Sequence, residues 1–487
     1  MRDSWCWVCL LLLFVGCGDP PIVLPDAGPT GPLCEPEDVI AALAAARSGD
    51  TVELGACRIE MTSMQVPPGV AVEGQGVGVT FIVAPNMIVA PNMIVAPNMV
   101  SGVHLSLGPD GTTALRDVTV ESPSVFGVYA EGAGDLALER VAVQSTTGIA
   151  LAVDGATSAA LSELTLGGPV TEANASALGT DFDSTTTATI GMVLLGATAT
   201  VTDVEIHGFA RHGALLVESE TSWSGGRVYE NVSNGVMVSG GTADLATVAI
   251  ESTLQSLTLA PTYGAIFSAS AAVTSRALEI RDAAGIGVVV ADATGTHTDL
   301  IAERNVTAAV WVQSSTDFAL EGTATRLSDN QFAGLVVADS TNVRVTGATI
   351  EGTREAPRPY GDRGGSIRVG DGIQLLGATE STTLSNLTLR GNERVGMLLD
   401  LAGATLATSP VADVSVDGAG TALGAIAQNG TVPADWDATI TRTGATVAND
   451  AAFAGALSVV EIRVSAEFPS VAELMADGLA SLVVPRT

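Results

Sequence analysis

VYENVSNGVMV (228–238), LSDNQFAGLVV (327–337) and LRGNERVGMLL (389–399) are three copies of one pattern in this 487-residue chain. Each copy reads apolar-x-x-Asn-x-x-x-Gly-apolar-x-apolar, and IAERNVTAAVWV (301–312) is a variant with Ala309 in place of the glycine. Glycines of this kind recur elsewhere in steps of about 21 to 24 residues. A period of 20–25 residues with short strands indicates a solenoid, in which each repeat is one coil stacked on the next.

Short segments with alternating apolar residues lie between these copies. They include VTV (118–120), VAV (141–143), LTL (164–166) and VEI (204–206). Alternate side chains of a strand face one side, so equivalent residues of successive coils stack ~4.8 Å apart in a continuous aliphatic core. We expect the asparagine of the pattern to occupy the turn, to adopt a left-handed backbone and to bond to the next asparagine in the stack.

We therefore predict an all-β fold, a right-handed parallel β-helix with about 14–17 coils over residues 50–465 and a length of ~70 Å. A leucine-rich repeat is excluded because no LxxLxL frame is sustained, and propeller blades need ~40–50 residues. Packed β-sandwich domains are the alternative that the pattern leaves open. Residues 466–487 contain FPSVAELMADGLASL (468–482), which is expected to form a C-terminal capping helix that covers the open end coil.

The N-terminal side of the repeats carries helix signals. In EPEDVIAALAAARSGDTVEL (35–54), Pro36 suits a first turn and apolar residues recur at helical spacing, so a cap helix over about 36–47 is expected. The turn Gly49-Asp50-Thr51 after such a helix resembles the opening of pectin-lyase-like right-handed parallel β-helices. The resemblance implies a single β-helix domain over 34–487, in a superfamily whose polyuronide enzymes use a groove flanked by loops.

The chain departs from the galacturonan hydrolases of that superfamily. It has no Asp-Asp, no Gly-His-Gly and no lysine. A lyase needs a base and a cation that holds the substrate carboxylate, and arginine is the only residue at hand for the base. A fold resemblance alone does not make an enzyme. The leading hypothesis is a non-enzymatic surface module that binds a glycan or a protein; the alternative is a lyase or glycoside hydrolase acting on an acidic polysaccharide.

The first residues resemble an export signal. Residues 1–16 hold an apolar run that is shorter than the ~20 residues of a membrane span and has the length of a signal peptide. Phe14-Val15-Gly16-Cys17 resembles a bacterial lipobox, which implies cleavage after residue 16 and lipidation of Cys17. With Gly18 next, the resemblance implies an anchor in outer-membrane lipid or a cell-surface location. An ordinary secretory signal is the alternative.

The segment after Cys17 is expected to be a tether. Residues 17–33 are rich in proline and glycine and cannot pack a core. Once the signal is removed and Cys17 is lipidated, Cys34 and Cys57 remain. Two cysteines in an exported chain most often form a disulfide, and two free buried thiols are the other interpretation.

The composition is strongly acidic. The net charge is −32, all 21 basic residues are arginine, and only 4% of residues are aromatic. Such a surface repels nucleic acid, so no nucleic-acid partner is expected. The charge keeps an otherwise apolar chain soluble; binding of a divalent cation is the more specific interpretation.

One insertion stands out between the coils. From Gly334 to Gly372 the spacing is about 14 residues longer than one coil, and TREAPRPYGDRGGS (353–366) accounts for it. Arginine binds carboxylate or phosphate and tyrosine stacks on sugars, which makes the insertion a candidate ligand site. The candidate residues are Arg354, Arg358, Tyr360, Asp362, Arg363, Arg368 and Asp371. The alternative is a solvated loop whose arginines offset neighbouring carboxylates.

Three weaker patterns suggest metals. Asp181 and Asp183 would lie on one face if their segment is extended, and they could then hold Ca²⁺ as a cofactor or act as paired acids. Three IVAPNM hexads (82–99) align methionines that could bind Cu(I), which would suit a periplasmic copper accessory protein; a tolerated duplication that packs as a coil side or a loop is favoured. The hexad methionines are Met87, Met93 and Met99. His207 and His212 are five residues apart, a weak metal pattern.

Overall fold

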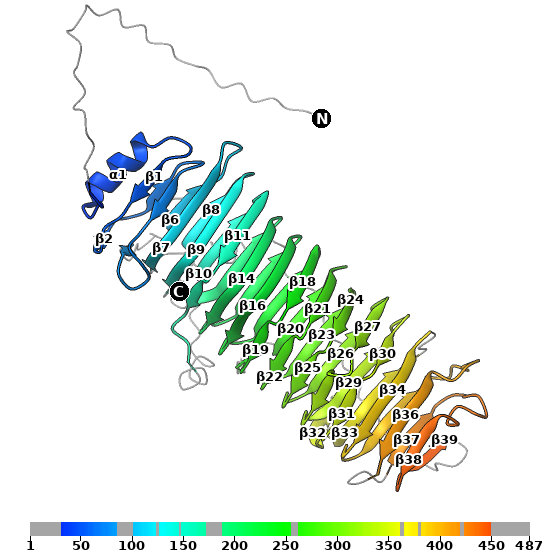
Figure 1. Cartoon of the computed structure of the whole chain (residues 1–487). Coiled ribbons are helices and arrows are strands. Elements are labelled where there is room, and N and C mark those ends of the chain that lie inside the picture. The colour runs from blue at the N-terminus through cyan, green and yellow to red at the C-terminus, as the bar shows by residue number, and fades with distance from the viewer. Residues whose placement is uncertain are drawn as a thin grey trace, which may run out of the picture.

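The computed structural model describes residues 31–84, 101–122, 126–145, 148–171, 188–254, 262–360, 365–377, 381–418 and 423–449. They form a rod of stacked strands with the helix α1 at its N-terminal end (Figure 1). All strand pairings are parallel except that of β32 with β33. The right-handed parallel β-helix is confirmed, with about 14 turns. The continuous parallel ladders exclude the sandwich alternative.

One sheet, here called the straight sheet, receives one strand from each coil. Its strands are β3 (Met64–Val66), β6 (Ser101–Ser106), β8 (Phe126–Glu131), β10 (Gly148–Asp154), β13 (Ala188–Leu195), β15 (His212–Val217), β17 (Asn234–Ser239), β20 (Tyr263–Ser268), β23 (Ile286–Ala291), β26 (Ala308–Gln313), β29 (Phe332–Ala338), β33 (Gly365–Leu376), β35 (Val395–Asp400), β37 (Leu423–Gln428) and β39 (Thr446–Asn449), and β32 (Ala356–Tyr360) pairs with β33.

The other sheet, here called the bent sheet, receives two arms from each coil, joined at a bend or fused into one long strand. Its strands are β1 (Thr51–Glu53), β2 (Arg58–Glu60), β4 (Ala71–Glu73), β5 (Phe81–Val83), β7 (Thr112–Ser122), β9 (Asp135–Ser145), β11 (Ser158–Ser162), β12 (Thr165–Gly167), β14 (Thr198–His207), β16 (Glu220–Tyr229), β18 (Thr242–Ala246), β19 (Ala249–Glu251), β21 (Ala272–Arg276), β22 (Glu279–Arg281), β24 (Thr294–Thr298), β25 (Ile301–Glu303), β27 (Phe318–Glu321), β28 (Arg326–Ser328), β30 (Arg344–Thr346), β31 (Thr349–Glu351), β34 (Thr383–Arg390), β36 (Val411–Asp417) and β38 (Ile440–Thr443).

Most of the described coils turn at three corners with left-handed residues. In the coil of β17, β18 and β19 these are Gly240, Thr247 and Ser252, with φ of 68°, 54° and 49°. Glycine and short polar residues adopt this conformation at least cost, which explains why aspartate, serine and glycine recur at the equivalent corners. The corners close each coil on itself, and the inward side chains of its strands then meet in the middle.

The core is aliphatic and in register from coil to coil. Val236, Ala265, Val288 and Val310 are successive Cα partners on the straight sheet, and all are buried. Stacking of like aliphatic side chains fills most of the interior, and only a few rings such as Trp223 and Phe267 lie among them, which agrees with the low aromatic content.

A ladder of buried asparagines joins successive coils at the corner before the straight sheet. Asn305 donates to Asn330 Oδ1 through both its side-chain nitrogen (2.8 Å) and its backbone N–H (2.9 Å). The expected bond between stacked asparagines is therefore present. The expected left-handed asparagine is wrong, because the positive φ belongs to the preceding residue, Arg304 (56°) or Asp329 (55°). The asparagine keeps an ordinary backbone conformation, and its side chain hydrogen-bonds to the backbone of the preceding coil.

The glycine of the pattern is required by close packing. A Cβ atom on Gly235 would lie 2.4 Å from Ile250 Cγ2 and 2.6 Å from the carbonyl oxygen of Gly264. Gly334 has the same surroundings, with Ile350 Cγ2 at 2.4 Å and the Gly372 oxygen at 2.7 Å. The regularly spaced glycines therefore mark the positions at which the backbone of the straight sheet lies against β-branched residues of the second arm.

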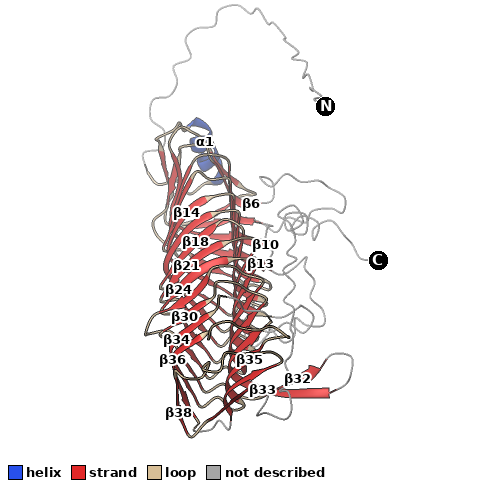
Figure 2. Ribbon diagram, turned by 90° about the vertical axis from the view of Figure 1, so that its right-hand side faces the viewer, coloured by secondary structure: helices blue, strands red, loops and turns tan. Residues whose placement is uncertain are grey.

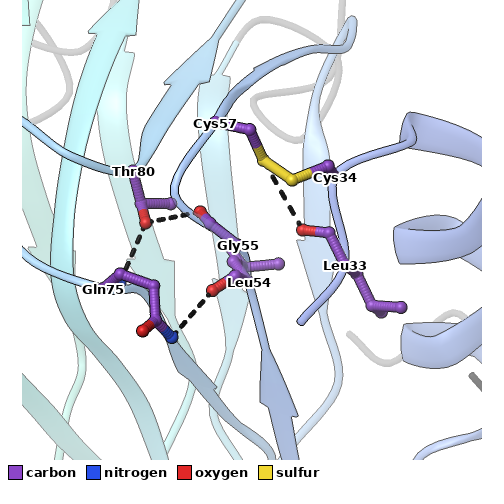
Figure 3. Close-up of a disulfide and its surroundings, with 7 residues drawn as sticks. All are labelled: Leu33, Cys34, Leu54, Gly55, Cys57, Gln75 and Thr80. Atoms are coloured by element: carbon purple, nitrogen blue, oxygen red, sulfur yellow. Dashed lines mark hydrogen bonds between the residues drawn. A yellow bond between two sulfur atoms is a disulfide. The ribbon is translucent and has the colours of Figure 1, made fainter. Parts of the chain in front are cut away.

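Helix α1 (Pro36–Ala45) packs Val39 and Leu43 against the first coil, two residues shorter than expected. A disulfide between Cys34 and Cys57 ties the chain before α1 to that coil, which is the pairing that the cysteine count favoured (Figure 3). In the same view Thr80 Oγ1 donates to the Gly55 carbonyl at 2.7 Å. The N-terminal end of the core is therefore closed by both a helix and a covalent link.

Several expectations concern segments that the structure does not describe. The signal (1–16), most of the tether, the hexad methionines, Asp181 and Asp183, and the C-terminal cap (466–487) lie outside the described residues. In the part of the chain that is described, no helix is long and apolar enough to cross a membrane.

We expect Asn330→Ala to destabilise the rod locally. The change leaves the backbone N–H and the side-chain nitrogen of Asn305 without the Asn330 oxygen that accepts from both in a buried site, at a cost of roughly 3 kcal/mol. Hydrogen exchange followed by mass spectrometry should show faster exchange in β25–β29. Ser222→Ala, at an exposed strand position, is the control, and equal exchange in the two variants would contradict the ladder's role.

A second prediction concerns the stability of the fold at low pH. His297 is buried between Phe267 and Phe318, and burial lowers its pKa to about 4. The unfolded chain binds a proton near the ordinary histidine pKa of ~6.5, so the neutral ring stabilises the fold above that pH and this contribution is lost as the pH falls toward 4. The loss should reach about 3 kcal/mol at most.

The urea midpoint of His297→Leu should therefore fall less than that of the wild type between pH 7 and 4.5. His207→Leu, on the half-buried surface, is the matched control. If the urea midpoints of the wild type and His297→Leu fall equally between pH 7 and 4.5, the buried ring does not control the sensitivity of the fold to acid.

Candidate functional site

The arginine-rich insertion is a β-hairpin that projects from the rod (Figure 2). Strand β32 pairs antiparallel with the first half of β33, and the second half of β33 continues as a rung of the straight sheet. Arg358 lies opposite Ile367, and Arg368 lies opposite Pro357 on the partner strand. The backbone therefore brings two arginines to neighbouring positions at the base of one hairpin.

The seven predicted residues of this insertion lie in different environments. Arg354 is exposed and pairs with Asp329 at 3.4 Å. Asp371 is fully buried on the straight sheet, where it accepts hydrogen bonds from Arg394 Nε (2.7 Å) and Gln374 Nε2 (2.8 Å). Asp371 thus bonds within the protein and is withdrawn from solvent.

The other five candidates belong to the projecting part. The backbone of Arg358, Tyr360 and Arg368 is in the hairpin strands, but their side chains are outside what the structure describes. Asp362 and Arg363, at the tip, lie outside the described residues altogether.

The two neighbouring histidines are on different faces. His207 stacks on Tyr229 on the bent sheet, with ring centroids 4.9 Å apart. His212 begins β15 on the straight sheet, where its Nδ1 lies 3.1 Å from Asn234 Nδ2, and burial lowers its pKa to about 4. They do not converge on a metal, and the described residues contain no cluster of three or more histidine, cysteine or acidic side chains that could hold one.

Arginines elsewhere on the described bent sheet pair with carboxylates of neighbouring coils. Arg227 pairs with Glu251 at 2.5 Å, and Arg281 reaches both Glu251 (3.7 Å) and Glu303 (3.3 Å). Glu303 is also paired with Arg326. This ladder runs along the second arm and neutralises charge between coils, which is the role that the sequence analysis gave as the alternative for arginine.

A polar groove runs along the first arm of the bent sheet. Two adjoining hollows, of about 440 and 480 Å³, share Thr296 and Asp317. Small side chains on several successive strands leave the surface concave there. The residues of this threonine groove that carry polar side chains are Thr221, Thr242, Asp244, Thr274, Thr294, Thr296, Asp317, Asn342, Arg344, Ser381 and Thr383.

Strand register aligns the groove with the rod axis. Asp244, Thr274, Thr296, Ala319 and Arg344 are successive Cα partners, so the row spans ~19 Å at the strand spacing. Asp244, Thr274 and Arg344 are exposed between buried neighbours, and Ala319 on the same row is a small, buried side chain. A linear molecule lying along the axis would therefore meet one outward side chain per coil.

The groove offers hydrogen-bonding groups rather than positive charge. Thr274 Oγ1 donates to Asp244 Oδ1 at 2.9 Å, and Asn342 Nδ2 donates to Asp317 Oδ1 at 3.0 Å. Arg344, the cation among the lining residues, donates to Glu321 Oε1 at 2.8 Å and is neutralised by it. Hydroxyl, amide and carboxylate oxygens remain along the open side, a set that suits a ligand rich in hydroxyl groups.

The two groove carboxylates are poorly placed for glycoside hydrolysis. Asp244 and Asp317 belong to coils three rungs apart, or ~14 Å at the strand spacing. The acid and base of glycosidases stand roughly 5–10 Å apart. Sequence reasoning missed this groove because threonine on a strand is ordinary; TGTHT (294–298), with threonine at alternate positions, was the available signal.

No family model and no curated protein matches the sequence. The A-module of mannuronan C-5 epimerase AlgE6 from Azotobacter vinelandii is similar in structure, with 14% identity, a TM-score of 0.35 and coverage of 84% of this chain and 94% of that chain. Tailspike protein 3 of bacteriophage CBA120 matches at 10% identity with a TM-score of 0.39, covering 89% and 61%. The catalytic domain of a GH87 α-1,3-glucanase matches at 10% identity and 0.27, covering 89% and 71%. At these values the likeness concerns the fold alone.

We expect Arg358→Ala/Arg363→Ala to abolish any retention of the protein by acidic polysaccharide. The arginines of the hairpin would supply the cations for such a ligand, and each lost arginine–carboxylate contact weakens binding. Affinity electrophoresis in gels that contain alginate or polygalacturonate measures this retention. Arg304→Ala, which removes an arginine already bonded to Asp282, is the control. Unchanged retention of the hairpin variant would remove the hairpin from consideration as a binding site.

Proposed function

We propose that this chain, a parallel β-helix of the pectin-lyase-like fold, is a non-enzymatic binding module of the cell envelope that holds a neutral, linear glycan along the threonine groove. The observation that carries the proposal is the alignment of a carboxylate and two hydroxyl groups, those of Asp244, Thr274 and Thr296, on three successive coils. A polysaccharide repeats its hydroxyl groups along one axis, as the groove repeats its side chains.

Charge favours a neutral ligand in this groove. Asp244 and Asp317 line the groove, and Arg344 is paired with Glu321. A polyuronate would bring its carboxylates against these aspartates without an unpaired cation to receive them, in a protein that already carries a net charge of −32. The hydroxyls of a neutral sugar instead donate to the carboxylates and accept from threonine.

The location is part of the proposal. The lipobox-like Phe14-Val15-Gly16-Cys17 and the proline-rich stretch to residue 33 support a module that is attached to outer-membrane lipid and held away from it. A rod whose N-terminal end is closed by α1 and a disulfide suits an oxidising compartment.

An enzymatic role at the hairpin is the second candidate. It is favoured by the placement of Arg358 and Arg368 at neighbouring hairpin positions, since a lyase needs cations to hold a substrate carboxylate. In that case acidic polysaccharide would be cleaved with release of unsaturated ends, whereas a binder releases no product.

The test of the groove is a steric block. We expect Thr274→Arg/Thr296→Arg to lower affinity for the neutral polysaccharide that the wild type binds by at least about tenfold, or ~1.4 kcal/mol, because the long side chains fill the concave surface. Isothermal titration against soluble mannan, dextran, laminarin and starch gives the affinity, with reducing-end and ultraviolet assays for products.

Thr200→Arg is the matched control, because Thr200 is exposed on the same row of outward positions but outside the groove. Equal binding by the groove variant and the control, no binding to any neutral polysaccharide, or release of product by the wild type would each overturn the proposal.

A further inference from the structure

The outer face of the straight sheet carries an apolar row that runs almost the length of the rod. Successive Cα partners place its members one per coil, at twelve rungs that span ~53 Å. This outer stripe consists of Tyr129, Ala152, Val193, Leu215, Met237, Ile266, Val289, Trp311, Val336, Gln374, Leu398 and Ile426. The straight sheet is therefore apolar on both faces, whereas the sequence analysis expected one inward apolar face.

The outer stripe is buried. Val289, Trp311 and Val336 have 0% of their surface exposed, and no member exceeds 3%. The members from Tyr129 to Val336 form a cluster separate from the core inside the coils, and Leu398 and Ile426 belong to a further small cluster. Among the residues that the structure describes, each straight-sheet strand packs on its neighbours and on the arms of its own coil, all of which lie inward or alongside. The described helices and strands do not supply the cover of the stripe, so the cover comes from chain outside these elements.

We propose that the C-terminal segment 450–487 folds back along the rod and packs on the outer stripe. The last described strand, β39, pairs with β37 and so ends on the straight sheet itself, next to Ile426. The 38 residues that follow reach ~125 Å when extended, more than twice the length of the stripe. The segment therefore starts beside the outer stripe and is long enough to cover it.

The sequence of the segment predicts an amphipathic helix that would pack on an apolar surface. In FPSVAELMADGLASL (468–482), Phe468, Val471, Met475, Leu479 and Leu482 recur at steps of three and four residues and share one face of a helix. Glu473 and Asp477 lie on the opposite face. Such a helix buries its apolar face only by packing on another apolar surface, and the end coil of a β-helix offers far less than the stripe does.

The internal segments outside the described ranges are a poorer match for the far half of the stripe. The three longest precede β6, β13 and β20, with at most 16 residues each, and so belong to the N-terminal half of the rod; those in the C-terminal half have three or four residues each. From Val289 onward the neighbouring connections are short, apart from the hairpin. A full-length cover for Trp311, Val336 and Leu398 is available from the C-terminal segment.

Hydroxyl-radical footprinting of the full, unlabelled chain tests whether the C-terminal segment packs on the outer stripe. Trp311 and Met237 report on the outer stripe, while Trp223 and Met192, inside the coils, report on global unfolding. We expect Trp311 to be protected in the wild type and to be oxidised at least about fivefold faster in Val471→Asp/Met475→Asp, with Trp223 unchanged. Ala480→Asp, on the polar face of the same predicted helix, should behave as the wild type does.

A photo-crosslinking residue in place of Val336 provides the second measurement and does not depend on the tail variants folding. Crosslinks should map to a peptide within 450–487. Crosslinks to any other segment, or Trp311 protection that the tail variants leave intact, would overturn the proposal. Protection that disappears on dilution would assign the stripe to a second copy of the chain and would overturn it as well.

Discussion

Parallel stacking requires each coil to return the chain to the same position one strand spacing further along. Every rung hydrogen-bonds to the rung before and after it, so a coil that fails to close disrupts its neighbours too. Closure depends on three left-handed corners, several of them at residues with a Cβ, such as Glu230 and Arg304. The strain of these corners is offset by contacts between coils: Arg304 bonds to Asp282, which occupies the same corner one coil earlier, through both Nε and Nη2 at 2.7 Å.

This geometry determines which residues are available for function. The second arm carries the arginine–carboxylate ladder, so its charges are satisfied between coils. The straight sheet is apolar outside and inside, so it is a packing surface. The first arm alone keeps small polar side chains in register on an open face, and the threonine groove lies there. The function that we propose follows from this division among the three faces of the described coils.

The sequence predicted what repeats and missed what depends on the neighbouring coil. The Asn-x-x-x-Gly pattern identified the solenoid because both residues meet equivalent partners at every turn, and the cysteine count favoured the Cys34–Cys57 link. The left-handed corner was assigned one residue late, since Asp329 and Asn330 both tolerate turns and only the ladder shows which one bonds. Asp371 was expected beside a ligand, yet Arg394, one coil later, pairs with it in a buried site. Register between strands, which creates the groove, leaves no local mark in the sequence.

The distance between outward positions of one row tests the stack most directly. Thr200 and Arg344 lie six rungs apart on the row that runs through Ser222, Asp244, Thr274, Thr296 and Ala319. Spin labels at Thr200 and Arg344 should give one narrow distance distribution near 29 Å, which is six strand spacings. A broad distribution, or a distance far from this value, would show that the coils are not stacked in this register.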